Sequence, residues 1–220
     1  MIEMEQVLEW RDRSMLIIGE GSTKDIVVGV PHHAPLDVEE LPCPDHRAAD
    51  ENAGLLGLCV ARLLNCSYII GCNYFLDSNK DQPSDYFKRL LAWKPRILVE
   101  IHGHGPKNAK YAIEISSGNE PRNDWSNEMA SRLGEKMAQS AVLPDYSICG
   151  DYDQIWSEAT KSKTITSNKW LPFHVELPKS LRSQKTHYQP FCELLAQVSS
   201  ARDGDEPRLC QGMKLNLRYL

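Results

Sequence analysis

The sequence predicts a single α/β domain over residues 1–220, a three-layer sandwich in which a mixed, mostly parallel sheet lies between helices. Short β-branched runs alternate along the chain with amphipathic segments, and this alternation is typical of a largely parallel sheet. The apolar runs do not alternate strictly in polarity, as expected for strands that helices cover on both faces. The chain has no internal repeat and no linker rich in Pro, Gly or Ser, so we expect one domain.

The expected elements follow one another in that alternating order. Predicted strands are the apolar runs at residues 26–30, 67–72, 96–101, 112–116 and 173–178. Predicted helices, with apolar residues at helical spacing, lie at residues 50–64, 85–93, 124–141 and 187–198. The polar segment 144–170, with a weak strand signal at 164–166, predicts a long loop near a site. Residues 204–220 predict no definite element.

The composition excludes several classes of function. The chain carries 25 Lys and Arg against 30 Asp and Glu, a formal net charge of −5, so it lacks the basic excess that nucleic-acid binding requires. No apolar run approaches the roughly 20 residues of a membrane helix. The first ten residues contain three Glu and no basic residue, which does not fit a secretory signal peptide. We expect a cytoplasmic protein that acts on a small molecule and binds neither nucleic acid nor membranes. A homo-oligomer is compatible with the sequence.

Two histidine pairs follow two of the predicted strands. His32 and His33 come directly after the first predicted strand, and His102 and His104 follow a later one. In open α/β sheets, ligands bind outside the carboxyl ends of the strands, so both pairs are candidates for one site. Strand alternation places Glu100 and His102 on the same face, and His104 as well if the strand continues.

Carboxylates complete a possible metal site. Asp50 and Glu51 stand at the start of a predicted helix that follows the first histidine pair. Two imidazoles and one carboxylate, with a fourth position open for water, are the ligand set of a catalytic zinc site. Such chemistry also needs a carboxylate that moves protons without binding the metal. Glu176, which shares a strand face with His174, is the candidate.

Five motifs resemble those of the N-formylglutamate amidohydrolase family, in the same order: VVGVPHHAP, HRAADENAG at a helix start, CNYFLDSNKD, LVEIHGHG and FHVELPKSLR. That family pairs a Pro-His motif after a strand with an acidic motif at a helix start. Motifs of the Asp-Leu-Asn-Arg, Asp-x-His-Ser and Gln-x-Glu-Leu types follow. The resemblance runs from about residue 25 to residue 182. It implies a phosphorylase/hydrolase-like fold, related to zinc carboxypeptidases and aspartoacylase-like enzymes, with a mixed sheet between helices.

The resemblance implies a set of metal ligands, position by position. His32 and His102 would bind one divalent ion, zinc. The acidic ligand would be Glu51 or its neighbour Asp50; we take Glu51 as the ligand and Asp50 as a residue that supports it. Glu100 precedes the second histidine ligand and is placed to orient its imidazole.

The resemblance also implies the catalytic and substrate-binding residues. Glu176 takes the place of the catalytic carboxylate, and Asn79, Lys80, His104 and His174 are the implied substrate-binding residues. The run DSNK at residues 77–80 departs from the family's Asp-Leu-Asn-Arg pattern and exchanges a bidentate fork for a point charge. The hydrolytic residues are therefore kept, whereas specificity for N-formylglutamate is not implied.

Three functions are compatible with these features. The leading one is a zinc-dependent hydrolase that cleaves a C–N amide bond, other than an ordinary peptide bond, in a small N-acyl amino acid or related compound. A cysteine hydrolase would use Cys149 or Cys43, but no pattern pairs either with a histidine, and seven cysteines without an export signal predict reduced thiols. The third is a metal or small-molecule binding protein that retains the hydrolase fold without catalysis.

Overall fold

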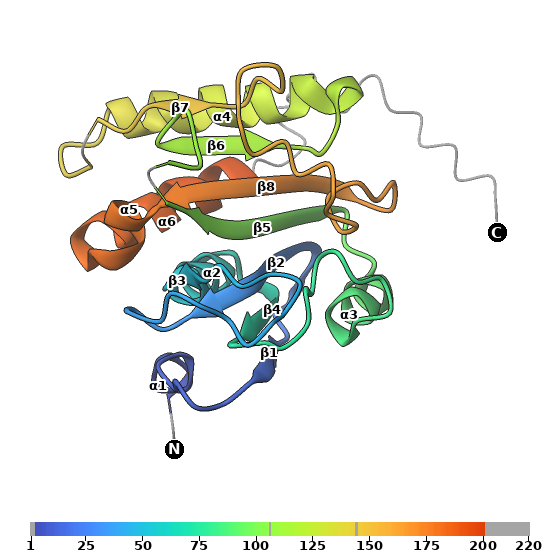
Figure 1. Ribbon diagram of the computed structural model, residues 1–220. Helices are drawn as coiled ribbons and strands as arrows, with labels where there is room; N and C mark the ends of the chain where they lie inside the picture. The colour runs from blue at the N-terminus through green and yellow to red at the C-terminus, as the bar shows by residue number, and fades with distance from the viewer. Residues whose placement is uncertain (1–2, 106, 144, 201–220) are drawn as a thin grey trace.

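The computed structural model describes residues 3–105, 107–143 and 145–200. Within these ranges, eight strands form one sheet in the order β1-β4-β2-β5-β8-β6-β7, with β3 paired to β2 (Figure 1). The central strands β4, β2, β5 and β8 are parallel, and β1 and β6 each have an antiparallel neighbour. The strands are β1 (Met15–Gly19), β2 (Thr23–Ala34), β3 (Asp50–Glu51), β4 (Cys66–Cys72), β5 (Ile97–His104), β6 (Ile113–Ser116), β7 (Ile148–Cys149) and β8 (Leu171–Pro178). The sheet is mixed and mostly parallel, as predicted.

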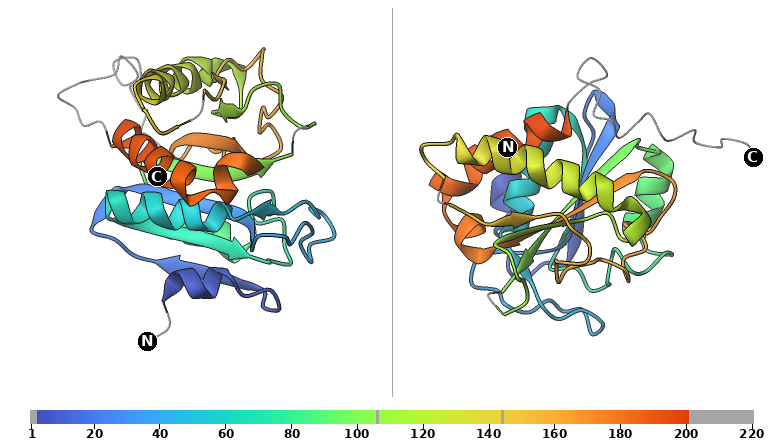
Figure 2. Two further views of the ribbon diagram at one scale, coloured as in Figure 1. Left: turned by 90° about the vertical axis from the view of Figure 1, so that its left-hand side faces the viewer. Right: turned by 90° about the horizontal axis from the view of Figure 1, so that it is seen from above.

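Helices cover both faces of this sheet. They are α1 (Met4–Leu8), α2 (Ala53–Leu64), α3 (Asp85–Trp93), the 3-10 turn η1 (Glu120–Arg122), α4 (Asn123–Ala138), α5 (Lys179–Ser183) and α6 (Lys185–Ser199). The larger apolar core joins one face to α2, α4 and α6, and a smaller core joins the other face to α3. Figures 1 and 2 show how these helices are arranged around the sheet. The predicted three-layer α/β sandwich is therefore confirmed. No helix in the described ranges is long and apolar enough to cross a membrane.

Two predicted segments differ in detail from the structure. The helix expected from residue 50 begins at Ala53, because Asp50 and Glu51 pair with β2 as β3 and Asn52 has a left-handed φ of 65°. The described part of segment 144–170 contains only the short β7 and otherwise runs as turns and loops, as expected. The ambiguous residues 204–220 lie outside the described ranges.

Alternation along β5 separates apolar packing from polar chemistry. Val99 and Ile101 belong to the larger core, on the face covered by α2. Glu100 and His102 therefore point to the opposite face, where α3 packs, and both are buried. The sequence prediction that these two side chains share a face is confirmed.

A β-bulge near the end of β2 sets the direction of the first histidine pair. Val30 pairs with Ile70 of β4 and His33 pairs with Cys72, so β2 has one more residue than β4 between these positions. An extra residue reverses the alternation of every side chain after it. Consequently His32 reaches the same face as His102, whereas His33 turns toward α2.

Gly71 is the β4 residue opposite this bulge, and its missing side chain makes the bulge possible. A Cβ at position 71 would lie 2.6 Å from the backbone oxygen of Pro31. We expect Gly71→Ala to destabilise the fold by about 1–3 kcal/mol, because the bulge must shift and His32 moves with it. Urea denaturation measures this effect, and a wild-type free energy of unfolding would contradict this account of the bulge.

Candidate metal centre

Histidines and carboxylates meet at the carboxyl ends of β2, β5 and β8. Three overlapping groups have ligand atoms within 4.8 Å of one another: His32, Asp50 and His102; Glu100, His102 and His174; and His32, His46 and Asp77. The parallel strands end at one edge of the sheet, which brings residues distant in sequence together. The predicted juxtaposition of His32 and His102 is present, with ring centroids 5.2 Å apart.

Asp50 lies between the two histidines. Its Oδ2 is 3.1 Å from Nδ1 of His102 and 3.6 Å from Nδ1 of His32. Burial raises the pKa of the Asp50 carboxyl, but the interactions with His102 and His32 outweigh burial and hold that pKa far below its usual value. Burial lowers the pKa of His102, yet Asp50 and Glu100 raise it to about 10. The three groups together contain the buried carboxylates of Asp50, Asp77 and Glu100, and such a concentration of acidic side chains suits a divalent cation.

Four buried polar atoms of the cluster have no hydrogen-bond partner in the part of the chain that the structure describes. Among the described residues, His32 Nδ1, His102 Nε2, His174 Nδ1 and Glu176 Oε2 are buried and have no hydrogen-bond partner. Buried polar atoms normally have partners, so a group of four unpartnered ones marks a place where a metal, water or substrate completes the structure. Two imidazoles and a carboxylate fit zinc.

Asp77 orients the ring of His32. The Nε2–H of His32 donates to Oδ1 of Asp77 at 2.9 Å, which turns Nδ1 toward Asp50. Metal-binding histidines are commonly held by a carboxylate in this way. Burial raises the pKa of Asp77, but hydrogen bonds from His32 and Lys80 outweigh it and lower the pKa to about 2. Sequence reasoning missed this role, although Asp77 opens the DSNK run.

Glu51, taken from the sequence as the acidic ligand, lies outside the cluster. The backbone N–H of Asp37 donates to its Oε2 at 2.8 Å, and Nζ of Lys179 lies 2.9 Å from its Oε1. Asp50 and Glu51 are consecutive residues of β3, so they point to opposite faces. The structure therefore corrects the assignment, because it places Asp50, not Glu51, beside His32 and His102.

Glu176 and His174 lie on the neighbouring strand β8. Glu176 is the register partner of His102, and its Oε1 is 3.0 Å from Nε2 of His174. Burial raises the pKa of Glu176, but His174 and His102 outweigh burial and lower it, so the group is a carboxylate at neutral pH. The free Oε2 and the 14% exposure of the side chain suit a residue that exchanges a proton with a bound molecule.

Glu100 lies beside His102 and is itself held by two hydroxyl groups. The hydroxyls of Tyr86 and Thr164 donate to its two carboxylate oxygens at 3.0 and 2.8 Å, and its Oε2 is 3.6 Å from Nε2 of His102. This is the orienting position that the resemblance implies for Glu100. Thr164 belongs to the long segment 144–170, whose location beside the site was expected.

Lys80 and His46 adjoin the cluster on the side of β4. Nζ of Lys80 is 2.8 Å from Oδ2 of Asp77 and 3.4 Å from Nδ1 of His46. The ring of His46 stacks on His32 with centroids 3.8 Å apart, a contact that the sequence did not indicate. Asn79 is buried and its Oδ1 has no partner among the described residues.

The second members of the two histidine pairs have other partners. His33 accepts the backbone N–H of Gly54 on Nδ1 and donates from Nε2 to the carbonyl of Leu8, which makes it a neutral link between α1, β2 and α2. The ring nitrogens of His104 lie 3.1 and 2.9 Å from the carbonyl oxygens of Gly105 and Ala112. Neither side chain belongs to the three groups of possible metal ligands.

His33 should make stability depend on pH without affecting metal retention. Burial lowers the pKa of His33 to about 4, below the ordinary value near 6.5, so the unfolded chain binds more protons between these values. Stability therefore falls as pH drops from 6.5 toward 4, by about 3 kcal/mol for this group. We expect His33→Asn to flatten that part of the pH profile in urea denaturation and to keep zinc. Loss of zinc from His33→Asn but not from His32→Asn would contradict the assignment of the pair.

A cysteine nucleophile finds no support in the geometry. Cys43 is buried, Cys149 is half-buried, and no histidine appears among the hydrogen-bond partners of either thiol in the described residues. A thiol nucleophile requires a base within hydrogen-bond reach. The structure therefore favours the metal cluster over the thiols as the reactive site.

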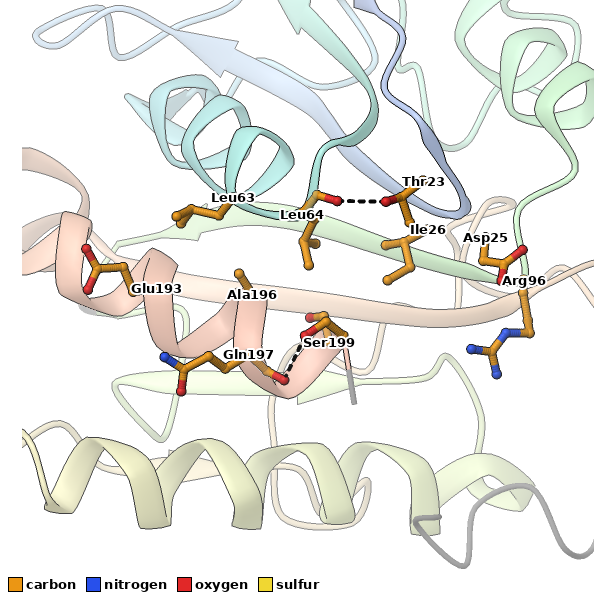
Figure 3. Close-up of a pocket in the computed structure, with 11 residues that line it drawn as sticks. Thr23, Asp25, Ile26, Leu63, Leu64, Arg96, Glu193, Ala196, Gln197 and Ser199 are labelled. Atoms are coloured by element: carbon orange, nitrogen blue, oxygen red, sulfur yellow. Dashed lines mark hydrogen bonds between the residues drawn. The ribbon is translucent and has the colours of Figure 1, made fainter. Parts of the chain in front are cut away.

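A groove of about 940 Å³ lies at the opposite end of the sheet (Figure 3). Its lining includes Thr23, Asp25 and Arg96, near the amino ends of β2 and β5, together with residues of α6. It contains none of the histidines. Because ligands of open α/β sheets bind at the carboxyl ends, this groove is not the candidate active site.

Comparison with known proteins supports the fold. No protein-family model and no curated protein matches the sequence. A bacteriophage poly-gamma-glutamate hydrolase is similar in structure, with a TM-score of 0.54 and 10% identity over 89% of this chain and 92% of that one. N-formylglutamate amidohydrolase from Ralstonia eutropha JMP134 gives 0.52 and 9% over 84% and 95%. The catalytic domain of CwlV, an N-acetylmuramoyl-L-alanine amidase from Bacillus (Paenibacillus) polymyxa var. colistinus, gives 0.51 and 14% over 80% and 96%. The resemblance seen in the sequence is thus confirmed at the level of the fold, which this chain shares with N-formylglutamate amidohydrolase and these other hydrolases.

Proposed function

We propose that the protein is a zinc-dependent hydrolase that cleaves the C–N amide bond of a small N-acyl amino acid or a related compound. The observation that carries the proposal is the buried group of His32, Asp50 and His102, in which Nδ1 of each ring faces the Asp50 carboxylate, directly beside the unpartnered oxygen of Glu176. Two imidazoles, one carboxylate and a nearby carboxylate base are the parts of a zinc hydrolase. The shared fold with three structures named as hydrolases or amidases supports the same class.

Each residue around the proposed metal position would have a separate role. His32, Asp50 and His102 would hold the ion, with Asp77 and Glu100 orienting the two imidazoles. Zinc, when bound, lowers the pKa of a bound water toward about 7 and polarises a carbonyl group. The free Oε2 of Glu176 would take the proton of the attacking water and later give it to the leaving amine. His174, bonded to the other oxygen of Glu176, would hold that carboxylate in place.

Lys80 and Asn79 are the proposed substrate-binding residues. The Lys80 side chain is 37% exposed, and its ammonium group contacts Asp77, the same carboxylate that accepts the hydrogen bond of His32. It could therefore pair with the carboxylate of an amino acid whose acyl carbonyl sits at the metal. The free Oδ1 of Asn79 could accept a substrate N–H.

Two measurements test the function. Elemental analysis of the purified protein gives the bound metal, and a panel of N-formyl, N-acetyl and longer N-acyl amino acids, including glutamate derivatives, gives the activity. We expect about one zinc per chain and hydrolysis that stops on chelation and returns with added zinc. Metal binding without any turnover would favour a binding protein, and turnover that resists chelation but yields to thiol alkylation would favour a cysteine hydrolase.

A further inference from the structure

Glu114 of β6 is a buried carboxylate that ties two loops together. It is 1% exposed and accepts four backbone N–H groups: those of Lys110 and Tyr111 at 2.7 and 3.2 Å on Oε1, and those of Trp156 and Ser157 at 3.0 and 2.8 Å on Oε2. In the described residues it has no Lys or Arg partner. Hydrogen bonds from N–H groups to an ionised carboxylate are strong, so four of them on one buried group fix both loops firmly.

This clamp, which is Glu114 with its four backbone N–H donors, lies beside Glu176, the proposed base. Glu114 is the register partner of Glu176 on β8, and the apolar neighbours Ile113 and Ile115 belong to the core on the opposite face. Glu114 therefore faces the same side of the sheet as Glu176. The loop that contains Trp156 and Ser157 has a further contact with β6, because the hydroxyl of Ser116 donates to the carbonyl oxygen of Glu158 at 2.7 Å.

The clamped loop carries an exposed tryptophan. Trp156 is 62% exposed, although its backbone N–H is bound to Glu114 and the preceding residue, Ile155, is buried. An exposed indole ring whose backbone is held in place suits the binding of flat ligand rings. The side chain loses little conformational freedom when a ligand ring stacks on it.

We propose that Glu114 is a positioning residue that fixes Trp156 beside the site, and that Trp156 recognises a flat ring in the acyl part of the substrate. This inference rests on the proposed amide hydrolysis. The order of the site residues across the strands gives the direction in which a bound substrate would lie. Lys80 and Asp77 follow β4, the proposed metal ligands lie on β2, β3 and β5, Glu176 is on β8, and Trp156 lies over β6. An N-acyl amino acid held by its carboxylate at Lys80 would extend its acyl group toward β6. The three strand spacings from β2 to β6 are about 14 Å, a span that such a molecule and an indole side chain can cover together.

The clamp is tested by amide hydrogen exchange, which needs no activity. Glu114→Gln keeps the shape but places an NH₂ group against two of the N–H donors. We expect the amides of residues 110, 111, 156 and 157 to exchange at least tenfold faster, while the exposed control Glu120→Gln leaves them unchanged. If Glu114→Gln does not fold, Glu114→Asp, which keeps the charge and shortens the reach, makes the same comparison. Unchanged exchange in a folded variant overturns the clamp.

The specificity is tested by binding in the Glu176→Gln background, in which turnover is expected to be greatly slowed. The probes are N-acetyl-, N-hexanoyl- and N-phenylacetyl-L-glutamate, measured by calorimetry on the zinc-loaded protein. We expect Trp156→Ala to weaken the phenylacetyl probe at least tenfold, and the acetyl and hexanoyl probes less than twofold. The matched control, Leu63→Ala, removes another exposed apolar side chain at the far end of the sheet.

Equal weakening of all three probes, or no binding of any, overturns the ring-recognition role. Hydrolysis by the wild-type protein is measured separately with the N-acyl panel. Turnover of N-phenylacetyl-L-glutamate that is indifferent to Trp156 refutes this inference and leaves the proposed function intact. Ring-selective binding without wild-type turnover refutes the proposed function and leaves Trp156 as part of a binding site.

Discussion

Replacing Glu176 with glutamine is expected to lower kcat/KM by about 10²–10⁴-fold, or 3–5 kcal/mol of barrier, while the protein keeps its zinc. Glutamine preserves the size of the side chain and its contact with His174 but cannot accept the proton of the attacking water. Oε2 of Glu176 has no protein partner among the described residues, so its loss breaks no structural bond there. Steady-state kinetics on the best substrate of the N-acyl panel, with metal analysis of the same sample, measure both quantities.

A matched control and a second readout separate catalysis from packing. Glu193→Gln removes an exposed carboxylate on α6, at the groove far from the site, and should leave kcat/KM within a factor of a few. Near-wild-type turnover of Glu176→Gln would remove Glu176 from the mechanism. Loss of zinc together with activity would instead make Glu176 a ligand.

The sequence predicts much of the fold because periodicity is local. The run at residues 85–93 becomes α3 with the same bounds, and β5 and β8 follow the predicted apolar runs within a few residues. The shared face of His174 and Glu176 also follows from strand alternation, and the two side chains are in contact.

Alternation fails where the pairing with a neighbour strand decides the geometry. Strict alternation from Val30 would place His33, not His32, on the face of His102; the bulge opposite Gly71 reverses that order. The motif order of the N-formylglutamate amidohydrolase family, which the sequence resembles, favours His32 without explaining why it faces His102. His46 and Asp77 come from loops, whose positions no periodicity describes, so their contacts with His32 could not be derived.

The choice of the acidic ligand also depends on strand pairing that the sequence pattern does not reveal. Asp50 and Glu51 are adjacent, equally acidic, and look like the first turn of a helix, where both would be favourable. Their division of roles depends on a two-residue strand that exists only because β2 lies beside it. Glu51 then meets Asp37 and Lys179, and Asp50 meets the histidines.

Zinc affinity should therefore respond very differently to the two acids. Asp50→Asn removes a charged ligand between His32 and His102, and we expect its zinc affinity to fall by more than the 10–100-fold that is typical of losing a residue that only orients a ligand. Asp77→Asn, which disturbs the orientation of His32 alone, should fall within that range. Glu51→Gln should stay within a few-fold of wild type, because its carboxylate contacts only Asp37 and Lys179 among the described residues.

Competition with a chromophoric chelator gives the three affinities, and thermal unfolding of each metal-free variant shows whether the fold is intact. Because Asp50 is the counter-charge that raises the pKa of His102 to about 10, metal-free Asp50→Asn should also lose much of the positive charge on that imidazole at neutral pH. The pKa of His102, followed by NMR in the metal-free protein, should then fall by well over one unit, with Glu51→Gln unchanged. If Glu51→Gln loses zinc while Asp50→Asn holds it, the ligand is the other acid, and β3 must present its opposite face to the histidines when the metal binds.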